Sequence, residues 1–118
     1  MKTIKDFFEN EVKWHFRKEE EGLIPILQEV IGEERSVIDK TLASHQEFRQ
    51  MYKQFLHSMD SFEKLLKLID RMMVFLETHA LWEDSTLFPI ANKLLNKDQM
   101  NNVILKIMEI EREQRSSG

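Results

Sequence analysis

Apolar residues recur along the chain at steps of three and four positions, a spacing that places them on one face of a helix. The pattern runs through residues 3–22, 33–58, 61–87 and 99–114. In the third stretch, the positions on this face are Phe62, Leu65, Ile69, Met72, Leu76, His79, Glu83 and Leu87. The pattern therefore predicts three long helices followed by a C-terminal helix.

The residues between these stretches indicate where the helices end. Pro25 and Pro89 each follow a helical pattern, and we expect each to stop or kink its helix. Gly32 is the expected stop after a short turn. Asp98 precedes the last stretch and is the expected N-cap. No linker separates two parts of the chain, so we expect residues 1–118 to form one helical domain.

Composition supports an all-α fold class. The 118 residues include only three Gly and two Pro, too few turn-formers for a sandwich or barrel of many short strands. Leu, Met, Glu, Lys and Gln, which are good helix formers, are common instead. The length suits one hydrophobic core and is short for two.

Charge and residue usage exclude several classes of function. The 17 Lys and Arg against 21 Asp and Glu give a net charge of −4, with no basic stripe, so we expect no nucleic-acid partner. The absence of Cys excludes disulfides, thiolate metal sites and thiol nucleophiles. No apolar run approaches the ~20 residues of a membrane span. The charged N-terminal residues do not resemble a signal peptide, so we expect a cytoplasmic protein without a membrane partner.

Five ionisable residues lie at positions that the helical period assigns to the core. They are His15, Glu19, His45, His79 and Glu83. A buried ionised carboxylate is costly unless it is paired or bound to a metal ion. Two such carboxylates, each one turn after a histidine, therefore call for a common partner.

The two histidine–glutamate pairs belong to an internal repeat. Residues 15–25 and 79–89 both read His-x-x-x-Glu-acidic-x-x-Leu-apolar-Pro, with an offset of 64 residues at every matched position. The spacing i, i+4 places imidazole and carboxylate side by side on a helix. Two such pairs on facing helices predict a metal site, with His45 as a fifth ligand from the helix between them, and such ligands suit iron, manganese or zinc.

The other polar residues near these motifs have simpler interpretations. Glu20, Glu21 and Asp84 lie off the core face, and we expect them to be solvated or hydrogen-bonded to the ligands. Arg49 can pair with Glu47 or with a site carboxylate, and surface pairing is favoured.

The remaining histidines and Tyr52 are judged by the same helical period. Taken alone, His45 is more typical of a core histidine than of a metal ligand, and its assignment as a ligand depends on the repeated pairs. Tyr52 shares its face and is expected in the core. His57 is turned about 120° away from His45, so we expect it to be exposed.

The segments 15–20, 45–49 and 79–89 resemble, in this order, the hemerythrin-like (HHE cation-binding) domain family. The resemblance covers residues 12–96 and implies an up-down helical bundle holding a non-haem di-iron centre. It implies metal ligands at His15, Glu19, His45, His79 and Glu83, with the carboxylates bridging the irons. Members bind or sense oxygen or nitric oxide, handle iron, or serve in repair of iron centres.

The chain departs from this family in one respect. The family's usual first helix, which supplies a further histidine, is missing, since only 14 residues precede His15. We therefore expect coordination positions left to water or substrate. Either the C-terminal helix or a second copy of the chain must cover that side, and we expect a homodimer because uncovered apolar faces mark interfaces.

Three functions follow as hypotheses. The first is a metal-binding sensor or carrier with a diatomic gas ligand, and we favour it over an enzyme because no substrate-recognition loop is evident. The second is a redox enzyme that activates oxygen, peroxide or nitric oxide at iron. The third is a metal-free helical interaction module, which would leave two core carboxylates without a partner.

Overall fold

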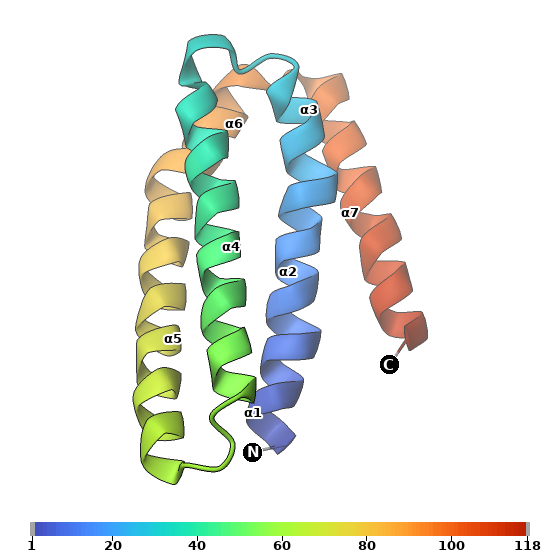
Figure 1. Cartoon of the computed structure of the whole chain (residues 1–118). Helices are drawn as coiled ribbons and strands as arrows, with labels where there is room; N and C mark the ends of the chain where they lie inside the picture. Colours follow the sequence, from blue (N-terminus) through green and yellow to red (C-terminus); the bar gives the residue numbers. More distant parts are fainter. Residues whose placement is uncertain (1, 118) are drawn as a thin grey trace.

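The computed structural model describes the backbone of residues 2–117 and the side chains of residues 4–116. This part of the chain is helical almost throughout and contains no strand, which confirms the all-α prediction. Three long helical rods lie side by side, and the C-terminal helix lies beside the first of them (Figure 1). None of the described helices is both long and apolar enough to cross a membrane.

The first rod, here called the N-terminal helix (residues 2–28), is continuous but changes its hydrogen-bond pitch along its length. It comprises α1 (Lys2–Asp6), the π-helix η1 (Phe7–Val12), α2 (Lys13–Arg17), the π-helix η2 (Lys18–Leu23) and α3 (Ile24–Gln28). A π-helix bonds each N–H to the carbonyl five residues earlier, so it has a wider turn than an α-helix.

The remaining elements complete the bundle and its C-terminal arm. In chain order they are the 3₁₀ helix η3 (Gly32–Glu34), α4 (Arg35–Leu56), α5 (Phe62–Trp82), the π-helix η4 (Glu83–Leu87), α6 (Phe88–Leu94) and α7 (Lys97–Ser117). Gly32 has a φ of 57°, a left-handed conformation that favours glycine, so the predicted break falls in the first connection.

Pro25 and Pro89 were each expected to stop or kink a helix, and neither stops it. Pro25 and Pro89 each lie in the first turn of an α-helical segment, α3 and α6, where a missing N–H is tolerated. A π-helix precedes each one, and the N–H groups of Ile24 and Phe88 bond to the carbonyls of Glu19 and Glu83. The helix continues through both prolines, although α6 bends away from the axis of α5 (Figure 1).

The apolar core is divided into two clusters along the bundle axis. One cluster, rich in aliphatic residues, comprises Leu23, Ile24, Leu27, Ile31, Val37, Ile38, Leu87, Ala91, Leu95 and Val103. The other, rich in aromatic residues, comprises Phe8, Val12, Phe16, Phe48, Phe55, Leu65, Leu68 and Met72. Along each of the three rods, buried polar residues separate the two clusters: Glu19, Thr41, His45, His79 and Glu83. The bundle therefore carries a polar layer between two apolar ones.

The C-terminal helix α7 packs along the N-terminal helix. Gly22 permits this approach, since a Cβ at this position would lie 3.0 Å from Cγ1 of Ile107. Further along the two helices, Lys18 Nζ lies 3.4 Å from Oε1 of Glu111. The seam between the two helices thus combines close packing with surface ion pairing.

The start of α7 differs from the prediction. The side chain of Asn96 accepts a hydrogen bond of 2.8 Å from the Gln99 N–H, and the Gln99 side chain accepts one of 2.8 Å from the Asn96 N–H. This reciprocal pair is a capping box. Asn96 is therefore the N-cap, and Asp98, the residue expected there, lies in the first turn.

Replacing Asn96 with Ala should cost about 1 kcal/mol of unfolding free energy, because the first turn of α7 loses its side-chain acceptor. The matched control Asp98→Ala should cost about 0.3 kcal/mol, since it removes only a favourable charge at the helix N-terminus. Urea denaturation of both variants measures the difference. A larger loss for Asp98→Ala would place the cap at residue 98 instead.

Candidate metal centre

Four buried side chains from all three rods meet in the polar layer. Glu19 comes from η2, His45 from α4, His79 from the end of α5, and Glu83 from the start of η4. Each offers one ligand atom, and the four atoms lie within 4.8 Å of one another. This arrangement brings together four of the five residues that the sequence predicted as ligands.

Each carboxylate presents its two oxygens to two different imidazoles. Oε1 of Glu19 lies 2.9 Å from Nε2 of His45, whereas its Oε2 lies 3.0 Å from Nε2 of His15. Oε2 of Glu83 lies 3.0 Å from Nε2 of His79, and its Oε1 lies 3.6 Å from Nε2 of His15. The five residues thus alternate as His45, Glu19, His15, Glu83 and His79.

Hydrogen bonds do not satisfy this cluster. Among the described residues, Oε2 of Glu19, Nε2 of His79 and Oε2 of Glu83 are buried and make no hydrogen bond, although short distances join them to neighbouring groups. Leaving such atoms unsatisfied is costly, and a bound cation would satisfy all three. Imidazole nitrogens and carboxylate oxygens are donors that iron, manganese and zinc accept, so the residues fit a metal ion.

His15 lies at the rim of the cluster, which corrects its predicted place in the core. Its side chain is 54% exposed. It lines a groove of about 310 Å³ between the N-terminal helix and α5, together with His79 and Glu83. The site is therefore closed on the side of His45 and open on the side of His15.

In the metal-free protein, His15 offsets part of the negative charge of the buried carboxylates. The adjacent carboxylates of Glu19 and Glu83 raise the pKa of His15 to about 10, against the opposing effect of burial. Burial would raise the pKa of Glu83, but the adjacent imidazoles of His15 and His79 outweigh it and hold that pKa well below its usual value. His15 therefore carries a positive charge beside the buried carboxylates when no cation is bound.

Aromatic rings fix the orientation of the two buried imidazoles. The ring of Phe16 stacks on His45 with centroids 3.9 Å apart and planes 9° from parallel. His79 lies nearly parallel to Phe75 and to Trp82, with centroid distances of 6.3 Å to each. Because stacked rings resist rotation of the imidazoles, their Nε2 atoms stay directed at the carboxylates.

Glu20 is a functional candidate that the helical period did not single out. Its Oε2 lies 2.7 Å from Nδ1 of His45, and its Oε1 accepts a hydrogen bond of 2.9 Å from the Arg49 guanidinium. Burial would raise the pKa of Glu20, but these contacts with Arg49 and His45 lower it. The π-helix η2 explains the difference, because its wider turn rotates consecutive residues less and lets Glu19 and Glu20 approach the same histidine.

The other polar residues lie away from the site. Glu21 is exposed and pairs with Arg17 at 2.6 Å, and Asp84 is exposed. His57, at the C-terminal end of α4, is exposed as predicted.

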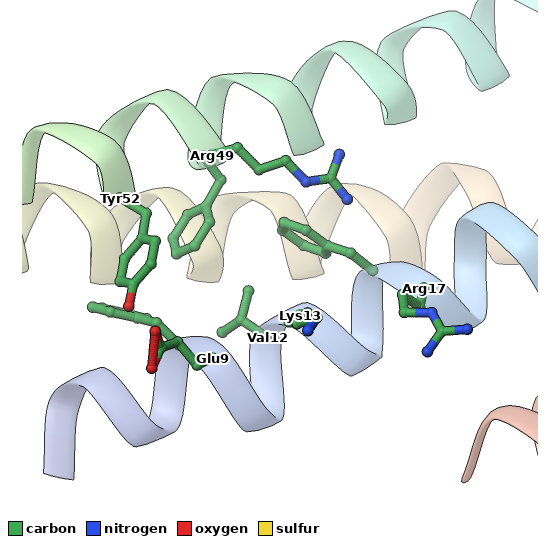
Figure 2. A pocket seen from close by; sticks show the side chains of 9 residues that line it. Glu9, Val12, Lys13, Arg17, Arg49 and Tyr52 are labelled. Atoms are coloured by element: carbon green, nitrogen blue, oxygen red, sulfur yellow. The ribbon is translucent and has the colours of Figure 1, made fainter. Parts of the chain in front are cut away.

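A second cavity of about 300 Å³ lies between the N-terminal helix and α4. Arg49 and Tyr52 border it from α4, and Glu9 lies close to the Tyr52 hydroxyl (Figure 2). Burial and this carboxylate raise the pKa of Tyr52 to about 12. Phe16 lines both this cavity and the groove beside His15, so its ring stands between them.

Comparison with family models gives two matches to the hemerythrin HHE cation binding domain, at residues 1–91 and 36–114. The two matches overlap over α4 and α5 and together span nearly the whole chain. Comparison with curated proteins and with solved structures found no match.

Replacing Phe16 with Ala should cost about 3–5 kcal/mol of unfolding free energy, because a 2% exposed ring is lost between the two cavities. The control Phe88→Ala removes a ring that is 38% exposed and should cost about 1 kcal/mol or less. Denaturant unfolding of the metal-free proteins measures both. Equal losses of unfolding free energy in the two variants would contradict the placement of the Phe16 ring in the core between the two cavities.

Proposed function

The chain belongs to the hemerythrin HHE cation-binding family, and we propose that its buried histidines and glutamates bind two iron ions. The observation that carries this proposal is the direction of the carboxylate oxygens. Glu19 and Glu83 each present one oxygen toward His15 and the other toward a buried histidine. Two carboxylates in this arrangement are suited to bridging a pair of ions.

The donor atoms divide naturally between two positions. The buried position takes Nε2 of His45, Nε2 of His79 and one oxygen from each glutamate, which are the four residues that converge within 4.8 Å. The rim position takes Nε2 of His15 and the remaining oxygen of each glutamate. The rim position therefore offers fewer protein ligands, and it lies beside the groove.

The open positions support binding of a small diatomic molecule. The groove beside His15 gives access to the rim, whereas Phe16, Phe75 and Trp82 enclose the buried histidines. A pair of irons held here would supply reversible binding of oxygen or nitric oxide, while the chain would hold the carboxylates and exclude bulk water from the buried side. We therefore propose a sensor or carrier of such a gas, or a protein that handles iron.

The direct test is metal content. Protein expressed with added ferrous iron and purified anaerobically should contain about two irons per chain. His79→Ala should lose most of this metal, because it removes a buried ligand. The control His57→Ala removes an exposed histidine and should keep the wild-type content. One iron per chain would overturn the dinuclear arrangement, and an absence of metal in the wild type would overturn the metal site.

Optical spectra then separate the functions. Reversible changes on exposure of the iron-loaded protein to oxygen or nitric oxide support a sensor or carrier. Repeated consumption of oxygen or peroxide with a reductant would instead indicate a redox enzyme. A loaded site dominated by manganese or zinc would reject iron while retaining the ligand set.

We further propose that two copies of the chain pair through α5. Residues at alternating steps of four and three form an apolar seam on the groove side of this helix: Phe62, Leu66, Ile69, Met73, Leu76 and Ala80. Phe62 is 71% exposed and Leu66 50% exposed, an unusual state for large apolar side chains on a regular seam. This spacing is the pattern by which two helices pack as a coiled coil. A second α5 on this seam would also cover the groove beside His15.

Light scattering at micromolar concentration should give twice the 14.2 kDa of one chain. Leu66→Glu should give a monomer, because it introduces a charge into the seam. Leu105→Glu is the matched control, since Leu105 is also exposed, at 60%, but lies on α7. A monomeric wild type, or equal effects of the two substitutions, would contradict pairing through α5.

A further inference from the structure

We propose that Glu20, held by Arg49, is a positioning residue that sets the orientation and proton placement of His45 for metal binding. This inference rests on the proposed metal site and deepens it. It concerns a carboxylate that points away from the converging ligand atoms and so does not itself reach the metal position.

The geometry gives the two ring nitrogens of His45 different partners. Nδ1 lies 2.7 Å from Oε2 of Glu20, and Nε2 lies 2.9 Å from Oε1 of Glu19, on the side where the ligand atoms converge. When Nδ1–H donates to Glu20, the lone pair of Nε2 is free for a cation. A carboxylate partner also makes the imidazole a stronger donor.

Arg49 keeps Glu20 in place from the opposite helix. Its guanidinium donates to Oε1 of Glu20 over 2.9 Å, which leaves Oε2 of the same carboxylate for His45. The guanidinium also lies 5.5 Å from the centroid of Phe16, the ring that stacks on His45. Carboxylate and ring thus restrain His45 from two directions, and Arg49 contacts both.

The internal repeat provides a matched comparison within the chain. Asp84 follows Glu83 as Glu20 follows Glu19, 64 residues earlier. Asp84 is exposed, whereas Glu20 is half-buried against His45. The two halves of the repeat are therefore inequivalent. Glu20, in the first half, lies against Nδ1 of His45, whereas Asp84, in the second half, is exposed. Stacked rings orient His79.

The test measures Co²⁺ affinity by competition with a chelator, and the Co²⁺ absorption spectrum as a report on the ligands. Glu20→Ala should weaken binding by about 10–100-fold, because His45 loses its partner. Glu20→Gln retains an oxygen that accepts a hydrogen bond from Nδ1 of His45, so this variant should lose less than about tenfold in Co²⁺ affinity. Arg49→Gln should also weaken binding, by less than Glu20→Ala. The control Asp84→Ala should match the wild type in affinity and spectrum.

The results distinguish this inference from the proposed function. A wild type that does not bind Co²⁺ overturns the metal site itself. A wild type that binds, with Glu20→Ala equal to it or no weaker than Asp84→Ala, overturns the positioning role alone. Melting temperatures of the metal-free variants show whether each is folded. If Glu20→Ala is not folded, Glu20→Gln and Arg49→Gln decide the question: unchanged affinity and spectrum in both overturn the positioning role.

Discussion

Two buried carboxylates on facing helices are the constraint on which the rest of this structure depends. Glu19 and Glu83 are 4% and 2% exposed, and they lie between an aliphatic and an aromatic cluster. Ionised carboxylates in such a place need compensating positive charge. Three imidazoles surround the carboxylates, and stacked rings hold the buried imidazoles in place. A bound metal ion would supply the remaining charge.

Both buried carboxylates lie on π-helical turns of the backbone. Glu19 lies in η2 and Glu83 begins η4, and each of these turns precedes a proline. Single π-helical turns within α-helices occur frequently at functional sites, where they change the direction of side chains. Here the wide turn in η2 brings Glu19 and Glu20 to opposite nitrogens of one histidine. An uninterrupted α-helix would separate these two side chains by 100°.

The sequence predicted the helices and the convergence of the buried histidines and glutamates because both follow from a single period. His45, His79, Glu19 and Glu83 are buried where the period of 3.6 residues placed them. The predictions from this period are incomplete or wrong where the helix has a different pitch, or where no neighbouring helix covers the predicted core face. The period left open whether Glu20 is solvated or hydrogen-bonded to a ligand, because it does not include the altered phase of the π-helical turn. His15 was expected in the core, but it is exposed because no described helix covers the groove beside it.

The last helix packs on the N-terminal helix and leaves the groove beside His15 uncovered. Gly22 lets α7 approach the N-terminal helix closely, and ion pairs extend that contact along its surface. The groove between the N-terminal helix and α5 remains open beside His15. The structure thus separates an enclosed half of the candidate site, around His45, from an accessible half beside His15.

The central claim is that a cation completes the buried layer, and thermal unfolding at controlled free Fe²⁺ concentrations under anaerobic conditions tests it most directly. An ion that binds the folded state stabilises it by about 2.7 kcal/mol at a hundredfold excess over its Kd. The wild-type melting temperature should therefore rise steadily with the logarithm of metal concentration, and that of Glu83→Gln should rise far less. A wild-type melting temperature that does not change, or an equal rise in both proteins, would contradict the account.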